Sequence, residues 1–533
     1  MINVVESGKQ MSHGSDGAVD AQGNPLPVLS KSASKMKIDR LLNTPLPTFT
    51  GNSPGSPFWT WSANKLLKST LKYQFRTFET TGTEKIPEDG GTLCCAWHTN
   101  GLIDPTSIMT SHPKNFVLGG RHDLVTRPIL GFWARKLAVQ PVVRQAELIR
   151  GGCSEEVAAT INGRSLLNLS TGIAHGFGCF LFPEGTSHDE PHLLRLKTGP
   201  MRTALSAAAL AKGTGKPIPW IIPIGLHWRV RHYWRTDAWV EYSEPIKLDA
   251  DKLGQEMADK LANGEWVEPP ADIVHSLRDE LRERLEYLTP NAKDWKTYRA
   301  WHLLGHLENI SNGKSPKTWR EEVLAAREVR ERLSIEPNEK RLEDAKMAAN
   351  ILEKHALDGR DITSTGNLKK TNISSNISLK SKIILALPML PIFFISCGLQ
   401  AILGKYLGDK NIDNEGLDAR TSFQFLASMF GSLFFWPPIA LVLSLILVMQ
   451  LDLLTALPSE VSSLSIFSNE FASTLVLTIL ILPLFAISAL IVVMGWDSLE
   501  DEKRSRRRNK LRKSDEGREL TSICKELIES SPK

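Results

Sequence analysis

The chain has 533 residues, more than one hydrophobic core usually organises, so two or three folded units joined by linkers are expected. Its 64 basic residues nearly balance 59 acidic residues, and the net charge of +5 is too small to predict nucleic-acid binding. The six cysteines lack the paired spacing of a zinc site or a disulfide framework, which indicates a reducing compartment for the main domain.

The first 56 residues are rich in Gly, Ser, Pro and Asn and show little apolar periodicity. Such a segment buries too little surface to offset its ordering entropy, so residues 1–56 are predicted to be a disordered tail. No basic stretch leads into an apolar run at the N-terminus, so a cleaved secretory signal is not expected.

Residues 57–83 mix aromatic and leucine residues with Lys65, Lys68 and Lys72. This is the composition of an amphipathic helix that lies in the lipid headgroup region. A helix packed on the surface of the domain has the same composition, so both interpretations stay open.

From residue 84 to residue 250, short apolar runs alternate with helix-like stretches. This rhythm predicts an α/β domain whose sheet is largely buried and flanked by helices. The runs expected to form strands are Gly91 to Trp97, Asn115 to Gly119, Leu137 to Val143, Cys179 to Phe182 and Trp220 to Gly225.

Residues 251–357 are strongly helical and charged. Four leucines are spaced to share one helix face: Leu277, Leu281, Leu285 and Leu288. We expect a helical appendage here, followed by a polar, Ser/Asn-rich linker over residues 358–380.

A membrane region is predicted over residues 381–496, because three apolar segments there reach the roughly 20 residues that a bilayer crossing requires. Residues 425–449 and 473–494 are expected to be transmembrane helices. Residues 383–402 contain Pro388 and Pro391, which remove backbone donors and kink a helix, so this segment is expected to be re-entrant or interfacial.

Residues 497–533 are predicted to be a basic cytosolic tail. The dense run from Lys503 to Lys513 suits an anionic cytoplasmic leaflet, with a nuclear or nucleic-acid signal as the alternative.

The stretch from Ala96 to Pro105 has the pattern of a strand, a turn and a helix start. A histidine takes a proton from an alcohol near neutral pH, and a nearby carboxylate fixes its tautomer and stabilises the imidazolium. His98 and Asp104 would lie about 120° apart on an ideal helix, so they meet only if a turn separates them. The structural alternative is that Asp104 is a helix N-cap and His98 an ordinary domain histidine.

A second polar segment, Phe182 to Asp189, follows another strand-like run, and sites form where strand ends lead into such loops. Gly185 lets a ligand approach the backbone, while Glu184 accepts hydrogen bonds from substrate hydroxyls. A tight turn with a capping carboxylate is the alternative.

Arg144 emerges from a third run, where its guanidinium is suited to bind a phosphate with two hydrogen bonds. Arg121 and Arg127 are expected to add positive charge to the same surface. The alternative is a set of solvated surface charges.

In this order and at these spacings, the blocks resemble the glycerolipid acyltransferase family, whose members acylate glycerol-3-phosphate and lysophosphatidate. The family's first motif has four residues between its His and its Asp, whereas this chain has five. That spacing, running on into Asp-Pro, is similar to the fungal-type glycerol-3-phosphate/dihydroxyacetone-phosphate branch. The branch resemblance covers residues 84 to 248 closely and the C-terminal membrane segments loosely. Within the first range it includes Gly131 to Arg135, Pro141 to Arg144, Phe182 to Gly185, Ser187 to Asp189 and Leu196-Lys197.

The resemblance implies that His98 is the general base and Asp104 its partner. It implies an acyl-CoA co-substrate, no metal, no bound cofactor, and glycerol-3-phosphate or a related phosphorylated acceptor. The implied substrate-binding residues are Arg144, Glu184, Gly185, Arg121 and Lys197, with the run Ile221 to Gly225 lining the acyl channel. Thr186 and Gln140-Pro141 depart from the branch pattern, which bears on acceptor preference.

The expected function is acylation of glycerol-3-phosphate or dihydroxyacetone phosphate, the first step of phospholipid and triacylglycerol synthesis, by an integral protein of the endoplasmic reticulum whose catalytic domain faces the cytosol. Within the class, the alternative is a lysophosphatidate or other lysophospholipid acyltransferase. Outside it, the alternatives are an inactive membrane scaffold and a metal hydrolase in which His188 or Asp189 joins His98 and Asp104 as ligands.

Loop charges predict the topology. The loop Gln450 to Glu470 has no Lys or Arg, so the positive-inside rule places it in the lumen and the basic C-terminus in the cytosol. A cytosolic catalytic domain then requires an even number of crossings, so residues 383–402 are predicted not to span. The loop Lys405 to Arg420 stays cytosolic, and the sequons at Asn372 and Asn376 stay unmodified.

Overall fold

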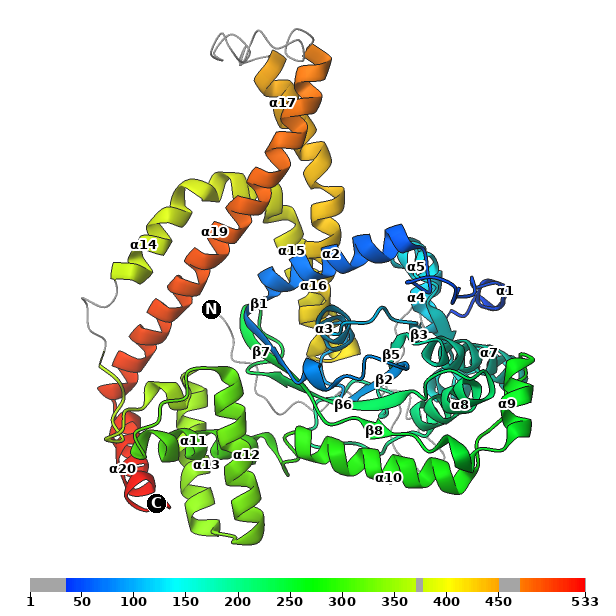
Figure 1. Cartoon of the computed structure of the whole chain (residues 1–533). Helices are drawn as coiled ribbons and strands as arrows, with labels where there is room; N and C mark the ends of the chain where they lie inside the picture. The colour runs from blue at the N-terminus through cyan, green and yellow to red at the C-terminus, as the bar shows by residue number, and fades with distance from the viewer. Residues whose placement is uncertain (1–34, 371–376, 450–469, 533) are drawn as a thin grey trace. The chain divides into compact units, whose positions relative to one another are not determined.

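The computed structural model describes residues 35–370, 377–449 and 470–532 (Figure 1). The chain divides into two compact units. The first contains Met1–His302, Pro316–Pro337 and Asn411–Thr421. The second contains Leu303–Ser315, Asn338–Lys410 and Ser422–Lys533.

A six-stranded mixed sheet forms the centre of the first unit, in the order β1-β7-β6-β2-β5, with β8 added on β6. β2 is parallel to both β5 and β6, whereas β6 is antiparallel to β7 and β8. A separate parallel pair is formed by β3 and β4. The strands are β1 Phe75–Thr81, β2 Thr92–Ala96, β3 Gly119–Arg121, β4 Gln140–Val142, β5 Gly178–Phe180, β6 Trp220–Trp228, β7 Thr236–Tyr242 and β8 Ile246–Lys247.

The predicted α/β class is confirmed. All five residues of β2 are buried, which is why its sequence is a continuous apolar run. Two of the five predicted runs contain β2 and β4, two others overlap β5 and β6, and the fifth ends where β3 begins. β1, β7 and β8 were not predicted.

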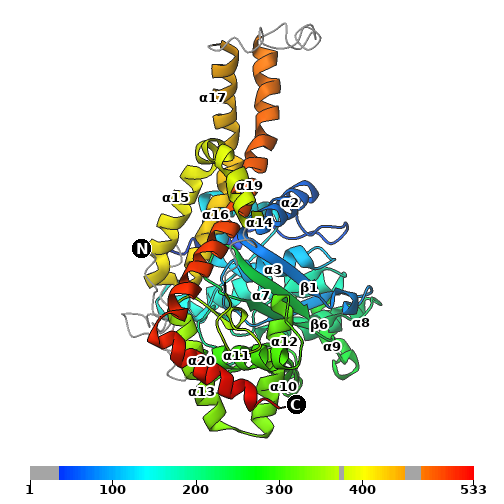
Figure 2. The same ribbon diagram turned by 90° about the vertical axis from the view of Figure 1, so that its left-hand side faces the viewer.

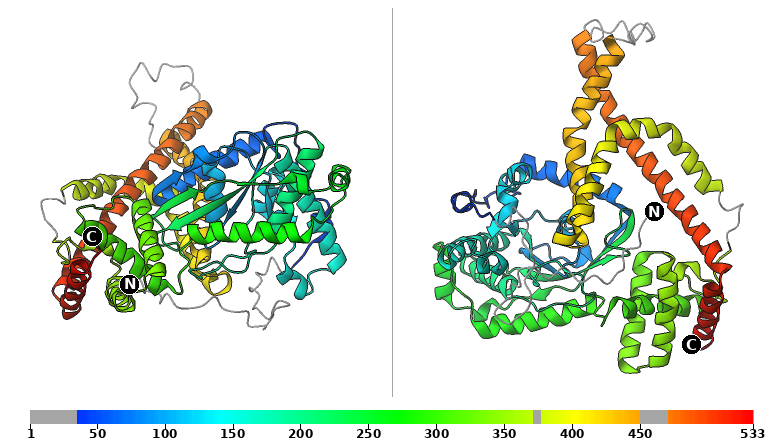
Figure 3. Two further views of the ribbon diagram at one scale, coloured as in Figure 1. Left: turned by 60° about the horizontal axis from the view of Figure 1, so that its bottom comes forward. Right: turned by 180° about the vertical axis from the view of Figure 1, so that it is seen from behind.

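Helices cover both faces of the sheet (Figures 1 and 3). α7 to α10 pack with β2 in one hydrophobic cluster, while α2 and α3 lie along β1 and β7 on the other face. The helices are α1 Ile38–Leu42, α2 Pro57–Gln74, α3 Ile103–Ser111, α4 His122–Thr126, α5 Pro128–Lys136, α6 Gln145–Ile149, α7 Glu155–Ala174, α8 Gly199–Gly213, α9 Gln255–Ala262, α10 Ala271–Leu288 and α12 Trp319–Ile335. α11 (Trp295–Ser311) runs from the first unit into the second.

α9 and α10 belong to the core of the first unit and not to a separate appendage. The predicted leucine face of α10 is buried, and it packs in the same cluster as β2 and α8. The boundary predicted at residue 250 therefore lies too early, because the apolar face of α10 covers β6.

The predicted disordered tail is too long. Residues 1–34 lie outside the described residues, but residues 35–56 pack on the first unit. Leu41 in α1 is buried, and the carbonyl of Pro45 accepts a hydrogen bond from Gln140 Nε2 at 3.0 Å. The predicted helix over residues 57–83 is also too long, since β1 begins at Phe75 and pairs with β7.

The second unit holds α13 (Glu339–Lys354) against α20 (Asp515–Glu529). Part of the predicted linker is folded there. Asp361, which is 1% exposed, pairs with Arg504 at 2.6 Å and with Arg508 at 2.9 Å. Two arginines of the predicted basic run thus have a structural role. Asn372 and Asn376 lie outside the described residues.

Three helical stretches of the described chain are long and apolar enough to cross a membrane: Lys380–Ile412, Asp418–Met449 and Glu470–Arg512. The first stretch is bent. α14 (Ile377–Ala386) ends in the 3-10 turn η5 (Leu387–Met389), which contains Pro388, and α15 (Leu390–Glu415) then turns back (Figure 3). α17 (Trp436–Met449), which follows α16 (Asp418–Phe434), runs beside α19 (Glu470–Arg512) (Figure 2).

Candidate active site

His98 and Asp104 meet across the turn between β2 and α3. β2 ends at Ala96, and Gly101 adopts a φ of 21°, a value that L side chains rarely reach. The His98 Nδ1 atom lies 2.9 Å from Asp104 Oδ2. The turn that the sequence required between the two residues is therefore present.

The carboxylate of Asp104 is completely buried and is held by several donors. Its Oδ2 accepts from the backbone N–H groups of Thr99 at 2.9 Å and Asn100 at 2.8 Å, and its Oδ1 accepts from Trp228 Nε1 at 3.1 Å. None of these donors is an amide of α3, and α3 has no side-chain cap. The N-cap alternative for Asp104 is therefore wrong.

These contacts fix the tautomer of His98. Because an ionised carboxylate only accepts, Nδ1 must donate, which leaves Nε2 as the acceptor nitrogen. The ring stacks on Phe182 with centroids 3.9 Å apart, and 15% of its side chain stays exposed. This arrangement presents a fixed base to a substrate proton.

Glu184 braces the catalytic turn from the loop after β5. Its Oε2 accepts from the His98 backbone N–H at 3.0 Å, and its Oε1 accepts from His188 Nε2 at 2.7 Å and from the Leu194 N–H at 2.8 Å. The Glu184 side chain has no exposed surface. The structure thus gives it a positioning contact with His98 in place of the predicted contact with substrate hydroxyls.

Gly185 and Lys197 lie together at the surface of this loop. Gly185 has a φ of 74°, a left-handed conformation that other residues adopt only with strain. Cγ of Lys197 lies 3.5 Å from the position of an added Gly185 Cβ, and the Lys197 N–H donates to the Pro183 carbonyl at 2.6 Å. The glycine is needed for the turn, and the exposed Lys197 is beside it.

Arg121, Arg127 and Arg144 form an arginine cluster supported by two buried acids. Asp123 pairs with Arg121 at 2.6 Å and Arg127 at 2.7 Å, and Glu147 pairs with Arg144 at 2.6 Å. Both acids are completely buried, whereas 24–28% of each arginine side chain is exposed. The cluster therefore presents preorganised guanidinium groups to solvent.

The arginine cluster lies at the same end of the parallel strands as the dyad. Phe116 forms a parallel bridge with Gly178 of β5, so the chain that enters β3 runs in the direction of β5. β4 is parallel to β3, with Arg121 opposite Val142. Arg121 is thus the last residue of β3 and Arg144 follows the carboxyl end of β4, as His98 and Glu184 follow the ends of β2 and β5.

His122 lies inside the arginine cluster. It is completely buried, and both ring nitrogens lack a hydrogen-bond partner among the described residues. Burial lowers the pKa of His122 below its ordinary value. The neutral ring adds no charge to the cluster.

Three contributors to the site were not predicted. Trp228, at the end of β6, donates to Asp104, and Asn100 donates its backbone N–H to the same carboxylate. Arg231 donates to the carbonyls of Thr99 at 2.6 Å and His188 at 3.0 Å. The position of Arg231 just after a buried strand was the one available signal.

The residues offered for a metal site are engaged elsewhere. His188 Nε2 bonds Glu184, its Nδ1 accepts from the Glu190 N–H at 3.2 Å, and Asp189 pairs with Arg231. They do not face His98 as a ligand set.

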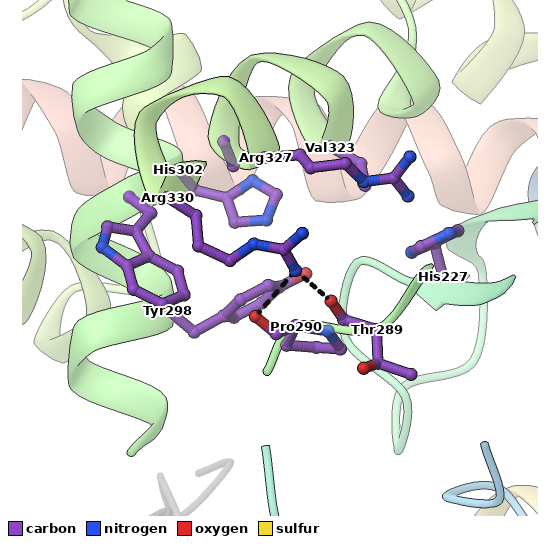
Figure 4. Close-up of a pocket in the computed structure, with 10 residues that line it drawn as sticks. His227, Thr289, Pro290, Tyr298, His302, Val323, Arg327 and Arg330 are labelled. Atoms are coloured by element: carbon purple, nitrogen blue, oxygen red, sulfur yellow. Dashed lines mark hydrogen bonds between the residues drawn. The ribbon is translucent and has the colours of Figure 1, made fainter. Parts of the chain in front are cut away.

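A separate small pocket of the first unit lies between α11, α12 and the turn at Thr289-Pro290 (Figure 4). The Arg330 guanidinium donates to the Thr289 carbonyl at 2.6 Å, and Arg327 pairs with Glu241 at 2.6 Å. Its volume of about 20 Å³ holds roughly one water, so it is too small for an acyl chain or a polyol phosphate.

Residues 77–227 match the family model described as Acyltransferase. This range begins in β1 and ends in β6, and it contains the dyad, the Glu184 loop and the arginine cluster. The chain therefore carries an acyltransferase domain.

Among characterised relatives, the chain is 34% identical over 152 residues to glycerol-3-phosphate O-acyltransferase 2 of Saccharomyces cerevisiae. It is 30% identical over 125 residues to glycerol-3-phosphate O-acyltransferase 1 of the same yeast. These matches cover 28% and 24% of this chain but only 19% and 15% of the relatives, so the chain spans less than a fifth of either. The predicted resemblance to the glycerolipid acyltransferases of the fungal branch is confirmed.

Among solved structures, the 1-acyl-sn-glycerophosphate (LPA) acyltransferase PlsC of Thermotoga maritima is 16% identical, with a TM-score of 0.27. The match covers 41% of this chain and 79% of PlsC. The fold assignment for this chain depends on its own sheet and its family match.

Proposed function

We propose that the chain is an acyl-CoA-dependent O-acyltransferase that acylates glycerol-3-phosphate or dihydroxyacetone phosphate. The observation that carries the proposal is the His98–Asp104 pair, in which Nδ1 of a partly exposed His98 contacts the carboxylate and Nε2 is the acceptor nitrogen of the neutral ring. A base of this kind activates a hydroxyl without a covalent enzyme intermediate.

In the proposed reaction, His98 Nε2 takes the proton of the acceptor hydroxyl as its oxygen attacks the thioester carbonyl carbon. A C–O bond forms, the C–S bond breaks, and the thiolate of coenzyme A leaves with the electron pair of that bond. The imidazolium of His98 then protonates the leaving sulfur, which regenerates the base. Buried Asp104 stabilises the imidazolium in between.

The arginine cluster supports a phosphorylated acceptor. Each guanidinium is oriented by a buried acid and each arginine side chain is partly exposed, an arrangement suited to bind phosphate by charge-assisted hydrogen bonds. The names of the two yeast relatives favour glycerol-3-phosphate as that acceptor. An integral protein of the endoplasmic reticulum with a cytosolic catalytic domain is part of the same proposal.

Purified protein incubated with acyl-CoA and a panel of acceptors tests this function. Glycerol-3-phosphate or dihydroxyacetone phosphate should be acylated fastest, and His98→Ala should be inactive on every acceptor. Faster acylation of lysophosphatidate or another lysophospholipid would replace the proposed acceptor. A wild-type protein inactive with the whole panel would favour the inactive-scaffold alternative.

A further inference from the structure

The segment Asn411–Thr421, which contains the end of α15 and the start of α16, folds with the first unit although it lies far beyond residues 77–227 in sequence. Thr421 Oγ1 donates to Asn100 Oδ1 at 2.7 Å, and both residues are 1% exposed. Asn100 is the residue whose backbone N–H donates to Asp104. The segment is therefore fixed to the turn that holds the catalytic pair.

The same segment brings a buried carboxylate toward His98. Asp418 is 6% exposed, accepts a hydrogen bond from Ser187, and lies close enough to Arg231 and His98 for electrostatic interaction. Ser187 belongs to the Glu184 loop, so the segment contacts both loops of the site. A buried carboxylate is costly unless cations lie near it, which makes this placement informative.

Arg231 joins the two loops that Asp418 faces. Its guanidinium, 10% exposed, donates to the Thr99 and His188 carbonyls and pairs with Asp189. Arg231 thus pairs with Asp189 and also interacts electrostatically with Asp418, and Asp104 adds another negative charge close to Asp418. Protonation of His98 during the reaction brings a positive charge into this negatively charged surrounding.

We propose that Asp418 is a positioning residue of the active site, which orients Ser187 and Arg231 and electrostatically favours the imidazolium of His98. This inference rests on the proposed function. On this inference, the segment between the first two apolar helices contributes to catalysis in addition to joining two membrane helices. The segment lies more than 180 residues after the end of the family match, so the match does not include it.

The test is Asp418→Asn in the full-length protein, which keeps the size of the side chain and removes its charge. Removing a nearby negative charge destabilises the imidazolium, so the acidic limb of the kcat/KM profile should move to lower pH and kcat should fall about 10-fold. The KM values of both substrates should change little. Asp409→Asn is the matched control, because Asp409 pairs with Lys405 on the surface of α15.

Thr421→Val, with Thr421→Ser as its rescue, keeps the proposal testable if Asp418→Asn does not fold. Valine removes the hydrogen bond to Asn100 and should lower kcat, while serine should restore it. A wild-type kcat and pH profile in Asp418→Asn, or a wild-type kcat in Thr421→Val, would overturn the inference. Both variants are compared with an active wild-type protein. If the proposed function is wrong, the wild-type protein itself is inactive, which distinguishes that result from a failure of this inference.

Discussion

At the scale of single residues, the two members of the catalytic pair differ in how many of their polar atoms are held by hydrogen bonds. Asp104 has no exposed surface and accepts from Thr99, Asn100 and Trp228 besides His98. His98 keeps one nitrogen free of these contacts. A carboxylate held so firmly keeps the imidazole in one tautomer throughout the reaction.

We expect His98→Ala to abolish transfer while the protein stays folded, because the partly exposed ring contributes to chemistry more than to the core. Asp104→Asn should lose nearly as much, since the amide does not hold His98 in the same tautomer. General-base catalysis contributes about 100-fold to 10,000-fold. Steady-state rates beside thermal melting check this, and activity above about a tenth of wild type would contradict the assignment.

Asp104→Asn also has a structural consequence of its own. Asparagine retains one acceptor oxygen but places an N–H₂ group among the donors from Thr99, Asn100 and Trp228. A buried donor left without an acceptor costs about 1–3 kcal/mol. Trp228→Phe, which removes one of those donors, is the control that should destabilise the turn less.

Arg144→Ala should raise the KM for the phosphorylated acceptor far more than the KM for acyl-CoA. A lost charge-assisted pair corresponds to about 1.5–3 kcal/mol, or on the order of 10-fold to 150-fold in KM. Arg144→Lys should rescue poorly, because lysine cannot bond Glu147 through two nitrogens as Arg144 does. Arg150→Ala, at the end of the same short helix, is the control, and equal losses for both substrates would mean a structural role for Arg144.

The catalytic pair could be read from the sequence because one turn brings it together, whereas the role of Glu184 could not. Its partners are the His98 backbone, the His188 ring and the Leu194 backbone, and the first comes from another strand. A carboxylate that binds substrate and one that braces a loop look alike in sequence. Arg231 was missed for the same reason, since its partners Thr99 and His188 come from two other loops.

At the scale of elements, the buried apolar run of β2 was predictable, whereas the exposed strand β1 and its buried partner β7 were not. β2 is buried along its whole length and reads as an apolar run, whereas β1 has only one buried residue of seven. Its pairing with β7, more than 150 residues later, decides its conformation. A leucine stripe likewise shows that α10 has a buried face, but it does not say that this face covers β6.

α2 combines the two interpretations that the sequence left open. It packs against β1, α3 and α5, and Trp59 makes edge contacts with Phe132 and Trp133. Phe58 and Trp61 remain 63% and 60% exposed, and Lys65, Lys68 and Lys72 continue the exposed face. We propose that the aromatic end of α2 enters the membrane interface.

A polarity-sensitive fluorophore attached at Trp61→Cys, in protein reconstituted into bilayers, should emit at a shorter wavelength than the same fluorophore attached at a site exposed to water. Lys72→Cys, at the other end of the same exposed face, is the matched control and should report water. Identical emission from both positions would mean that α2 only packs on the domain.

At the scale of the whole chain, the two compact units do not follow the predicted domain boundaries. Residues 251–302 complete the acyltransferase core, and residues 411–421 return to it from between two apolar helices. Sequence segmentation assigns such pieces by composition, so a short polar connection between hydrophobic helices was interpreted as a loop. Its burial of Asp418 and Thr421 against the catalytic turn depends on tertiary contacts alone.

The contact of residues 411–421 with the catalytic turn supports the predicted topology. A segment that hydrogen-bonds Asn100 must lie on the same side of the membrane as the catalytic turn. The preceding stretch, Lys380–Ile412, is bent at η5 into α14 and α15, which suits a segment that enters the bilayer and returns. We therefore predict two full crossings, within Asp418–Met449 and Glu470–Arg512.

Membrane-impermeant thiol labelling of sealed vesicles with their cytosolic face outward tests this topology, in a background without reactive native cysteines. Lys405→Cys, at a side chain that is 74% exposed, should be labelled without detergent. Ser462→Cys, in the loop without Lys or Arg that is predicted to be lumenal, should be labelled only after the vesicles are opened. Protection of residue 405, or a glycan on Asn372, would mean that the first apolar segment crosses or that the catalytic domain faces the lumen. Because the Thr421–Asn100 bond keeps residues 411–421 on the side of the catalytic domain, protection of residue 405 with that bond intact would mean that the active site is lumenal, away from cytosolic acyl-CoA.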